Sequence, residues 1–205
     1  MVYDTLNPEV LRFLLQEAEE GARILDVGCG TGRLGKALKE KVNCFIAGIE
    51  CDPEAARQAS EAYDEVLVTD LEALIAGREG FDWSSSYDCL VFGDVLEHTS
   101  QPLGLLRYFK GCLKEDGVLI ASIPNVANWM IRLRLLCGNF DYSGGILDAG
   151  HLKFFTYKGA RRLLEEGGFR ILAVRNNNHT FLLRMLGRVY KRMFAFQFVF
   201  KCVKA

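Results

Sequence analysis

The residues best suited to chemistry are three glycines and two acids in the first quarter of the chain. Gly28, Gly30 and Gly32 follow an apolar run and open a segment of helical period, so their backbone N–H groups can face a ligand at a helix N-terminus. Glu50 lies 20 residues after Gly30, where a carboxylate can accept hydrogen bonds from both hydroxyls of a ribose. Asp26, just before the turn, favours a ligand with an amino group or cationic centre over a pyrophosphate. The pattern predicts an adenosine with an amino-acid end rather than a dinucleotide.

An α/β fold is predicted to position these residues. Apolar runs rich in β-branched residues alternate with segments of helical period, which is typical of a parallel sheet with helices on both faces. Strands are expected at residues 23–27, 44–50, 65–69, 88–92, 118–123, 169–175 and 196–203. Helices are expected at residues 8–21, 34–41, 53–63, 103–113 and 156–166, the first capped by Asn7 and the last by Thr156. A chain of 205 residues can bury one full-sized core, so we expect a single domain over residues 1–205.

Two segments interrupt the alternation. Residues 125–155 are rich in aromatics and glycine and separate the fifth strand from its helix, and residues 180–195 join the last two strands. Insertions of this kind usually lie over the ends of a sheet, where ligands bind. We therefore expect residues 125–155 to cover the substrate. The sequence KEDG at 114–117 is expected to be a turn into the fifth strand.

Five motifs in order make the chain resemble the class I S-adenosylmethionine-dependent methyltransferases. They are ILDVGCGTG (24–32), GIECDPEA (48–55), VTD (68–70), YDCLVFGDVLEH (87–98) and KEDGVLIASIPN (114–125). The resemblance covers nearly the whole chain. It implies a Rossmann-like, seven-stranded, mostly parallel sheet whose last strand is antiparallel, with S-adenosylmethionine as methyl donor and S-adenosylhomocysteine as product.

The resemblance also implies which residues hold the donor. The three glycines of the turn would line the methionine portion, and Asp26 would support that loop and the amino group. Glu50 would hold the ribose. The remaining contacts it implies are Cys51 and Leu71 near the adenine, Asp70 at the adenine amino group, and Gly93 and Asp94 near the sulfonium.

The acceptor that the resemblance implies is a small molecule, with a hydroxyl oxygen favoured over a nitrogen. Residues 138–156 are similar to a motif of bacterial methyltransferases tied to polysaccharide and cell-envelope pathways, and ubiquinone-type O-methyltransferases share the general layout. The Asn/Asp-Pro-Pro-Tyr/Phe signature of enzymes that methylate amino groups of bases and glutamine is missing, and the corresponding stretch reads GDVLEH.

Three histidines are candidates for removing the proton of a hydroxyl acceptor. His151 lies in the insertion, where an acceptor is expected, and is the candidate catalytic base, with a buried hydrogen-bonding role as the alternative. For Glu97 and His98, which follow the fourth strand, a role in shaping the loop is favoured. His179 is expected to be a polar turn residue.

Charge limits the partners. The net charge of -1 excludes a uniformly basic nucleic-acid binder, yet residues 1–125 carry -11 and residues 126–205 carry +10. This charge separation indicates either two parts of the chain that complement each other or an acceptor, anionic or sugar-derived, that faces the C-terminal part. Residues 181–194 place basic side chains among apolar ones at helical spacing, which suits a membrane-surface or partner contact, or a packed helix with a solvated face.

Cysteine usage indicates the compartment. The seven cysteines are scattered and never spaced C-x-x-C, which is typical of a reduced, cytoplasmic protein. No Cys/His cluster has zinc spacing, so no metal is expected. No uncharged apolar run reaches about 18 residues, so no membrane span is expected. A secretion signal is not expected either, because Asp4 and Glu9 stand where such a signal has a basic start and an apolar stretch.

Two other functional classes stay open. An NAD-dependent oxidoreductase would also use the glycine turn and Glu50, although Asp26 argues against it. A non-catalytic binding partner that senses S-adenosylmethionine would keep the same pocket, because nothing in the sequence proves a competent acceptor site.

Overall fold

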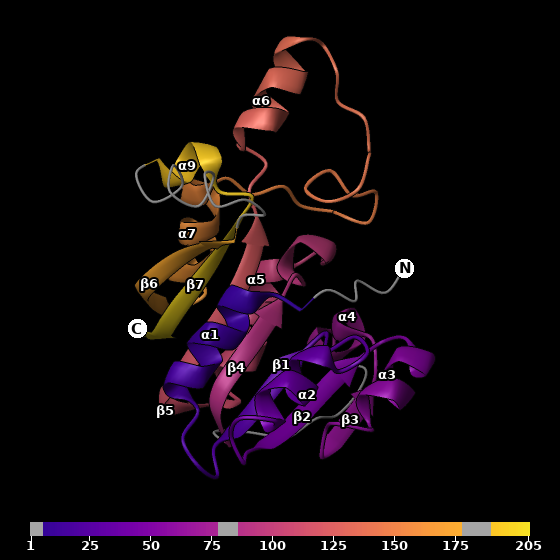
Figure 1. The fold of residues 1–205 in the computed structure, drawn as a ribbon, viewed down its shortest axis with the longest axis vertical. Helices are drawn as coiled ribbons and strands as arrows, with labels where there is room; N and C mark the ends of the chain where they lie inside the picture. The colour runs from indigo at the N-terminus through magenta and orange to yellow at the C-terminus, as the bar shows by residue number, and fades with distance from the viewer. Residues whose placement is uncertain (1–5, 78–85, 178–189) are drawn as a thin grey trace.

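A seven-stranded sheet runs through the centre of the molecule in the order β3-β2-β1-β4-β5-β7-β6 (Figure 1). The computed structural model describes residues 6–77, 86–177 and 190–205. The strands are β1 (Arg23–Val27), β2 (Phe45–Glu50), β3 (Glu65–Val68), β4 (Tyr87–Gly93), β5 (Leu113–Pro124), β6 (Phe169–Asn177) and β7 (Gln197–Lys204). Strands β3, β2, β1, β4 and β5 pair in parallel, and β7 is antiparallel to both β5 and β6. The predicted Rossmann-like sheet and its antiparallel last strand are confirmed.

Helices cover both faces of this sheet. They are α1 (Pro8–Glu17), α2 (Arg33–Lys39), α3 (Pro53–Ala59), α4 (Leu71–Ile75), η1 (Leu96–His98), α5 (Pro102–Lys110), α6 (Trp129–Leu136), α7 (Tyr157–Glu166) and α9 (Lys191–Phe194). Successive strand residues point to opposite faces. Ile24 of β1 therefore shares a buried cluster with Leu14 of α1 and Leu38 of α2, whereas its neighbour Leu25 shares another with Leu105 of α5.

The two helix caps expected from the sequence are present. Asn7 Oδ1 accepts hydrogen bonds from the backbone N–H groups of Glu9 and Val10, at 3.1 and 3.4 Å. Thr156 Oγ1 accepts one from the N–H of Gly159 at 3.2 Å. Each side chain satisfies N–H groups that the first helical turn leaves without intrahelical partners, which fixes where α1 and α7 begin.

The turn expected at residues 114–117 is instead an irregularity within β5. Tyr87 pairs with Leu113 and Cys89 with Val118, so a short step along β4 faces a longer one along β5. The surplus residues leave the regular ladder while the strand continues, as in a β-bulge. The turn prediction was therefore wrong about the start of the strand, because a turn-like sequence can be accommodated inside a strand.

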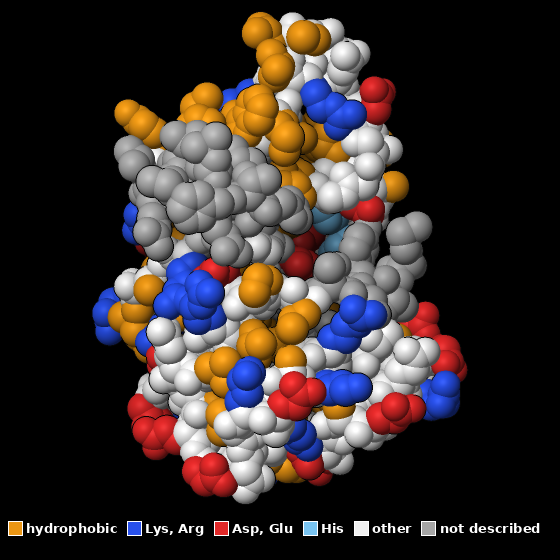
Figure 2. All heavy atoms as spheres, in the orientation of Figure 1, with side chains coloured by type: hydrophobic (Ala, Val, Ile, Leu, Met, Phe, Trp, Pro, Cys, Tyr) orange, Lys and Arg blue, Asp and Glu red, His pale blue; other side chains and the backbone are white. Residues whose placement is uncertain are grey.

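Helix α6 and the chain after it project beyond the carboxyl end of β5 (Figure 1). Ile131, Ile146 and Leu147 form a small buried cluster of their own within residues 125–155. Apolar side chains gather on part of the outer surface of this insertion, beside polar and charged ones, as Figure 2 shows at the top of the molecule. Its exposed large apolar residues are Met130, Leu133, Leu135, Leu136, Phe140, Tyr142 and Leu152.

Most of the basic segment 181–194, and His179, lie outside the described residues. Within the segment the structure describes the short helix α9, where the Arg192 guanidinium lies 5.8 Å from the centre of the Tyr157 ring. The amphipathic contact expected for this segment stays a prediction. Across the described part of the chain, the helices are too short or too polar to span a membrane.

Candidate functional site

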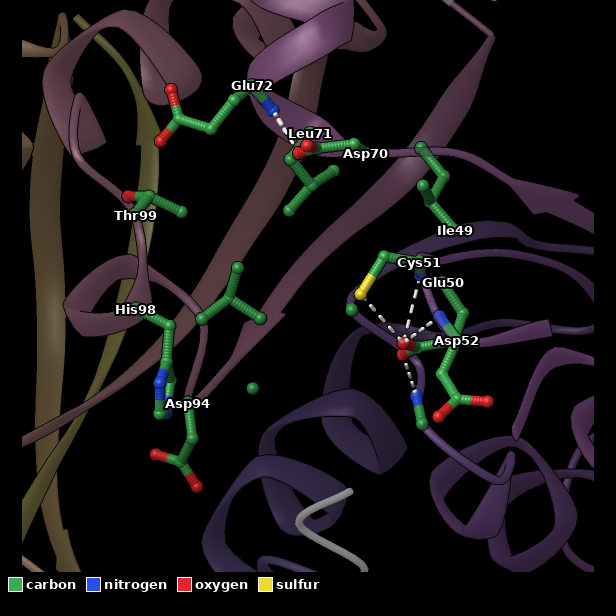
Figure 3. Close-up of a pocket in the computed structure, with 14 residues that line it drawn as sticks. Ile49, Glu50, Cys51, Asp52, Asp70, Leu71, Glu72, Asp94, His98 and Thr99 are labelled. Carbon is green, nitrogen blue, oxygen red and sulfur yellow. Dashed lines mark hydrogen bonds between the residues drawn. The ribbon is translucent and has the colours of Figure 1, made fainter. Parts of the chain in front are cut away.

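A cavity of about 380 Å³ opens at the carboxyl ends of β1, β2 and β4. From β1 the chain first adds β2 and β3 on one side and then crosses to add β4 and β5 on the other side. Ligands of such sheets bind in the crevice at this switch point, between β1 and β4. The structure brings together eight of the ten expected donor contacts along the cavity wall, namely Gly28, Gly30, Glu50, Cys51, Asp70, Leu71, Gly93 and Asp94. Figure 3 shows the residues that follow β2 on one side of the cavity and those that follow β4 on the other.

The carboxylate of Glu50 is fixed by backbone N–H groups. Oε1 accepts hydrogen bonds from the N–H groups of Cys51 and Asp52, at 2.9 and 3.0 Å, and Oε2 accepts one from Gly30 at 2.9 Å (Figure 3). These bonds tie the end of β2 to the glycine turn after β1. Oε2 with one such bond can accept another, because a carboxylate oxygen offers about two acceptor sites. The arrangement suits a ligand hydroxyl arriving from the cavity.

Glycine is required in the turn for two different reasons. Gly28 has φ +74°, and a Cβ there would lie 2.5 Å from Val95 Cγ2, so the loop after β4 packs directly on its backbone. Gly32 has φ +82° and caps α2 outside the cavity lining, and its Cβ would lie 2.7 Å from Ala59 Cα. Gly32 thus lets the start of α2 approach α3, and its expected contact with the methionine portion stays a prediction.

Asp26 is buried behind the turn and accepts a hydrogen bond from the Tyr63 hydroxyl at 2.6 Å. It lines a smaller pocket of about 70 Å³ that shares Gly28, Gly93 and Asp94 with the main cavity, so the two spaces adjoin. Burial raises the pKa of Asp26 to about 6, against the bond from Tyr63 that lowers it. An ammonium group that reached this carboxylate would favour its charged form.

The start of α4 forms another side of the cavity. Asp70 caps this helix and accepts a hydrogen bond from the N–H of Glu72 at 2.8 Å, and Leu71 is the first helical residue. Glu72 also lines the cavity, and its Oε1 accepts a hydrogen bond from the N–H of Ser100 at 2.7 Å. Glu72 was missed by the sequence reasoning, although its position two residues after an N-capping acid was a signal that could have located it.

Asp94 joins three strands at the floor of the site. It adopts φ +58°, and its N–H donates to Ser122 Oγ while its Oδ1 accepts from Ser122 Oγ, both at 3.0 Å. Gln197 of β7 also donates to Asp94 Oδ1, and Gln197 Oε1 accepts from Asn7 Nδ2 at 2.6 Å. Burial raises the pKa of Asp94 to about 6. Asp94 is therefore held directly by β5 and β7, and the start of α1 supports it through Gln197.

Two histidines meet at the edge of the cavity. His98 lines it, and His151 of the insertion packs against His98 with ring centres 4.7 Å apart. Burial lowers the pKa of His151, with a hydrogen bond to the Ile146 carbonyl opposing it. His151 does not itself line this cavity, and its pairing with His98 was not expected from the sequence, where they lie far apart.

The sheet order, the glycine turn after β1 and the fixed acid after β2 define the class I S-adenosylmethionine-dependent methyltransferases. The family described as "Methyltransferase domain" matches residues 3–174, and the chain belongs to this family. The membership removes the dinucleotide-dependent oxidoreductase from consideration and leaves open which acceptor is methylated.

Individual relatives agree with this family. The chain is 32% identical over 127 residues to a ubiquinone biosynthesis O-methyltransferase of Xanthomonas campestris pv. campestris. The aligned region covers 58% of this chain and 51% of that protein. The chain thus spans about half the length of the curated relatives it matches.

Solved structures share the fold. An S-adenosylmethionine-dependent methyltransferase from Mesorhizobium loti superposes with a TM-score of 0.68 at 18% identity, over 96% of each chain. A magnesium protoporphyrin IX methyltransferase from Synechocystis PCC 6803 with bound S-adenosylhomocysteine gives 0.68 at 18% identity, over 96% of this chain and 81% of that one. At such identities the similarity establishes the fold alone.

Proposed function

We propose that this chain transfers the methyl group of S-adenosylmethionine to a hydroxyl oxygen of a small molecule. The observation that carries the proposal is Glu50, whose carboxylate is held by three backbone N–H groups at the wall of a cavity of about 380 Å³. An acid fixed in this way after the second strand can hold ribose hydroxyls. The name of the relatives, ubiquinone biosynthesis O-methyltransferase, supports the choice of oxygen as acceptor.

The residues of the chain would bind and orient the reactants. S-adenosylmethionine, when bound, supplies a methyl group already activated by its positive sulfur. Glu50 would hold the ribose, Asp70 and Leu71 would border the adenine, and Asp26 would accept a hydrogen bond from the amino group. Alignment and exclusion of water account for most of the rate in such a displacement. The backbone at Gly93 would border the reacting sulfur.

The acceptor would lie between the sheet end and the insertion, residues 125–155. This insertion brings His151 against His98 at the cavity edge, so it supplies part of the acceptor wall. A hydroxyl acceptor must lose its proton as the new bond to carbon forms. His98 and His151 lie beside the position where the acceptor would release this proton, which supports an acceptor on this side of the cavity.

Two measurements test the proposal. Calorimetry with S-adenosylhomocysteine should show one binding site per chain, and absence of binding to folded protein would refute it. A coupled assay for S-adenosylhomocysteine release should then respond to a phenol, sugar or lipid hydroxyl acceptor. Binding without turnover on any of these classes would favour the alternative of a non-catalytic protein that senses S-adenosylmethionine.

A further inference from the structure

Three potential metal ligands meet beside the cavity. Glu97 and His98 belong to η1, and His151 belongs to the insertion. One donor atom from each lies within 4.8 Å of the donors of the other two. Figure 2 shows histidine and acidic side chains in the hollow below the projecting insertion, so an ion from solvent can reach this part of the surface.

Both imidazole rings are oriented by backbone carbonyls. His98 Nδ1 lies 3.0 Å from the Gly150 carbonyl oxygen, and His151 Nδ1 lies 3.0 Å from that of Ile146. A neutral ring that donates from Nδ1 to a carbonyl carries its lone pair on Nε2, the tautomer in which histidine usually binds a metal. These bonds therefore fix the tautomer that a metal site requires.

Glu97 supplies a second, independent observation. Its side chain is 1% exposed, and across the described residues neither carboxylate oxygen has a hydrogen-bond partner. The Glu97 carbonyl oxygen, in contrast, accepts bonds from the N–H groups of Leu152 and Lys153, at 2.8 and 3.0 Å, which join η1 to the insertion beside His151. A buried acid without a partner is costly, so a group that satisfies it is expected. A cation held with the two histidines would be that group.

We propose that Glu97, His98 and His151 bind one divalent first-row transition-metal ion, such as Zn²⁺ or Co²⁺. Two imidazole nitrogens and one carboxylate suit these ions better than Mg²⁺ or Ca²⁺, which prefer oxygen ligands alone. Bonds of about 2.1 Å place ligands roughly 3.0 to 3.4 Å apart, so side-chain movements on the order of 1 Å would close the site. Three protein ligands leave a position open for another molecule.

The ion would act on the acceptor, and this step rests on the proposed function. Because His98 lines the cavity, the open position would face the acceptor side. A bound hydroxyl loses its proton to solvent more easily, since a metal ion lowers its pKa. The oxygen then forms the bond to the methyl carbon, and the sulfur–carbon bond breaks with its electron pair remaining on sulfur. His151 is a metal ligand in this arrangement, and no free base is needed.

The test uses the whole chain after treatment with a chelator. Titration with Co²⁺ should give a visible absorption band that saturates at one ion per chain. Glu97→Gln keeps the shape of the side chain and removes its charge, so it should weaken Co²⁺ binding at least tenfold. Cys137→Ser is the matched control, because this exposed thiol could bind the ion instead and does not line the cavity. It should bind as the wild type does.

A second measurement on the wild type avoids any folding defect of a variant. The chain has three histidines, and Zn²⁺ should shift the ring nitrogen resonances of two of them by NMR. No saturable binding, equal binding by Glu97→Gln, loss of binding in the thiol variant, or no shift of two histidines would each overturn the metal site.

Calorimetry with S-adenosylhomocysteine on the same samples separates this inference from the proposed function. Metal binding without binding of that compound refutes the methyltransferase proposal and leaves the metal site standing. Binding of that compound without metal refutes the metal site alone.

Discussion

Replacing Asp26 with Asn should move stability and donor affinity in opposite directions. The Asp26 side chain is buried, and burial raises its pKa from 3.8 to about 6. The unfolded chain therefore releases this proton at a lower pH than the folded chain does, and stability falls as the pH rises from about 4 to 6. Asn is neutral at every pH and can still accept the Tyr63 hydrogen bond, so the variant should lose this dependence.

The size of the effect on stability follows from the raised pKa of Asp26. A difference of about two pKa units corresponds to about 3 kcal/mol in the free energy of unfolding. Above pH 7, wild-type Asp26 destabilises the ligand-free protein by this amount. For a chain of this length, that is roughly 6 to 12 °C in melting temperature. Donor binding should change the other way, because a hydrogen bond to a charged partner is worth about 1.5 to 3 kcal/mol. Asp26→Asn should thus weaken S-adenosylhomocysteine binding by roughly 10- to 100-fold at pH 7.5.

Chemical denaturation of both proteins at pH 4 and pH 8, with calorimetry at pH 7.5, measures these quantities. Asp64→Asn is the control of opposite sign. Although burial opposes it, the bonds from Lys39 and from the N–H of Ile46 lower the pKa of Asp64, so this change should destabilise the chain at pH 8. An Asp26→Asn protein no more stable than wild type at pH 8, or with unchanged donor affinity, would contradict a buried, charged Asp26 that contacts the donor.

Four further substitutions test the site and its surroundings. Glu50→Gln should weaken S-adenosylhomocysteine binding at least about tenfold in calorimetry, because the bonds from the backbone lose their charged acceptor; unchanged affinity would contradict its role. Gly28→Ala should lower the free energy of unfolding in urea by about 2 to 4 kcal/mol, because its Cβ would meet Val95. Gly21→Ala, at φ +80° with nothing within 4 Å of its Cβ, should lower it by about 1 to 2 kcal/mol. Equal costs would disprove the close approach. Leu136→Ser, at an 84% exposed position, should shift unfolding by less than about 0.5 kcal/mol, and a larger loss would show hidden packing.

Most of the sheet could be predicted because its central strands β1, β2, β4 and β5 are largely buried on both faces and read as apolar runs. The prediction of β1 matches the observed Arg23–Val27 at both ends. The predicted start of β5 fails because KEDG has the composition of a turn, and only pairing with β4 shows that the chain stays extended there. Helices α4 and α6 were missed because α4 is short and the apolar residues of α6 do not gather on one face.

The candidate donor site was predictable to the extent that local sequence determines it. Glu50 and the glycine turn follow directly from strand ends, and the fold brings them within 2.9 Å. The burial of Asp26 against Tyr63 depends on how α3 packs and has no local signal. The meeting of His98 with His151 depends on the path of the insertion, and for this reason metal-ligand spacing along the chain says nothing about it.

The place of β7 in the sheet has a consequence for folding kinetics. Val118 of β5 pairs with Val203 of β7, and β6 joins the sheet through β7. The long stretch of chain between β5 and β7 must close into a loop before these strands can pair. This closure carries an entropic penalty that the contacts between the strands offset only afterwards. Until β7 docks, β5 therefore keeps an unpaired edge, and β6 reaches the sheet only through β7. That transient edge is where chaperone binding or aggregation would compete with productive folding.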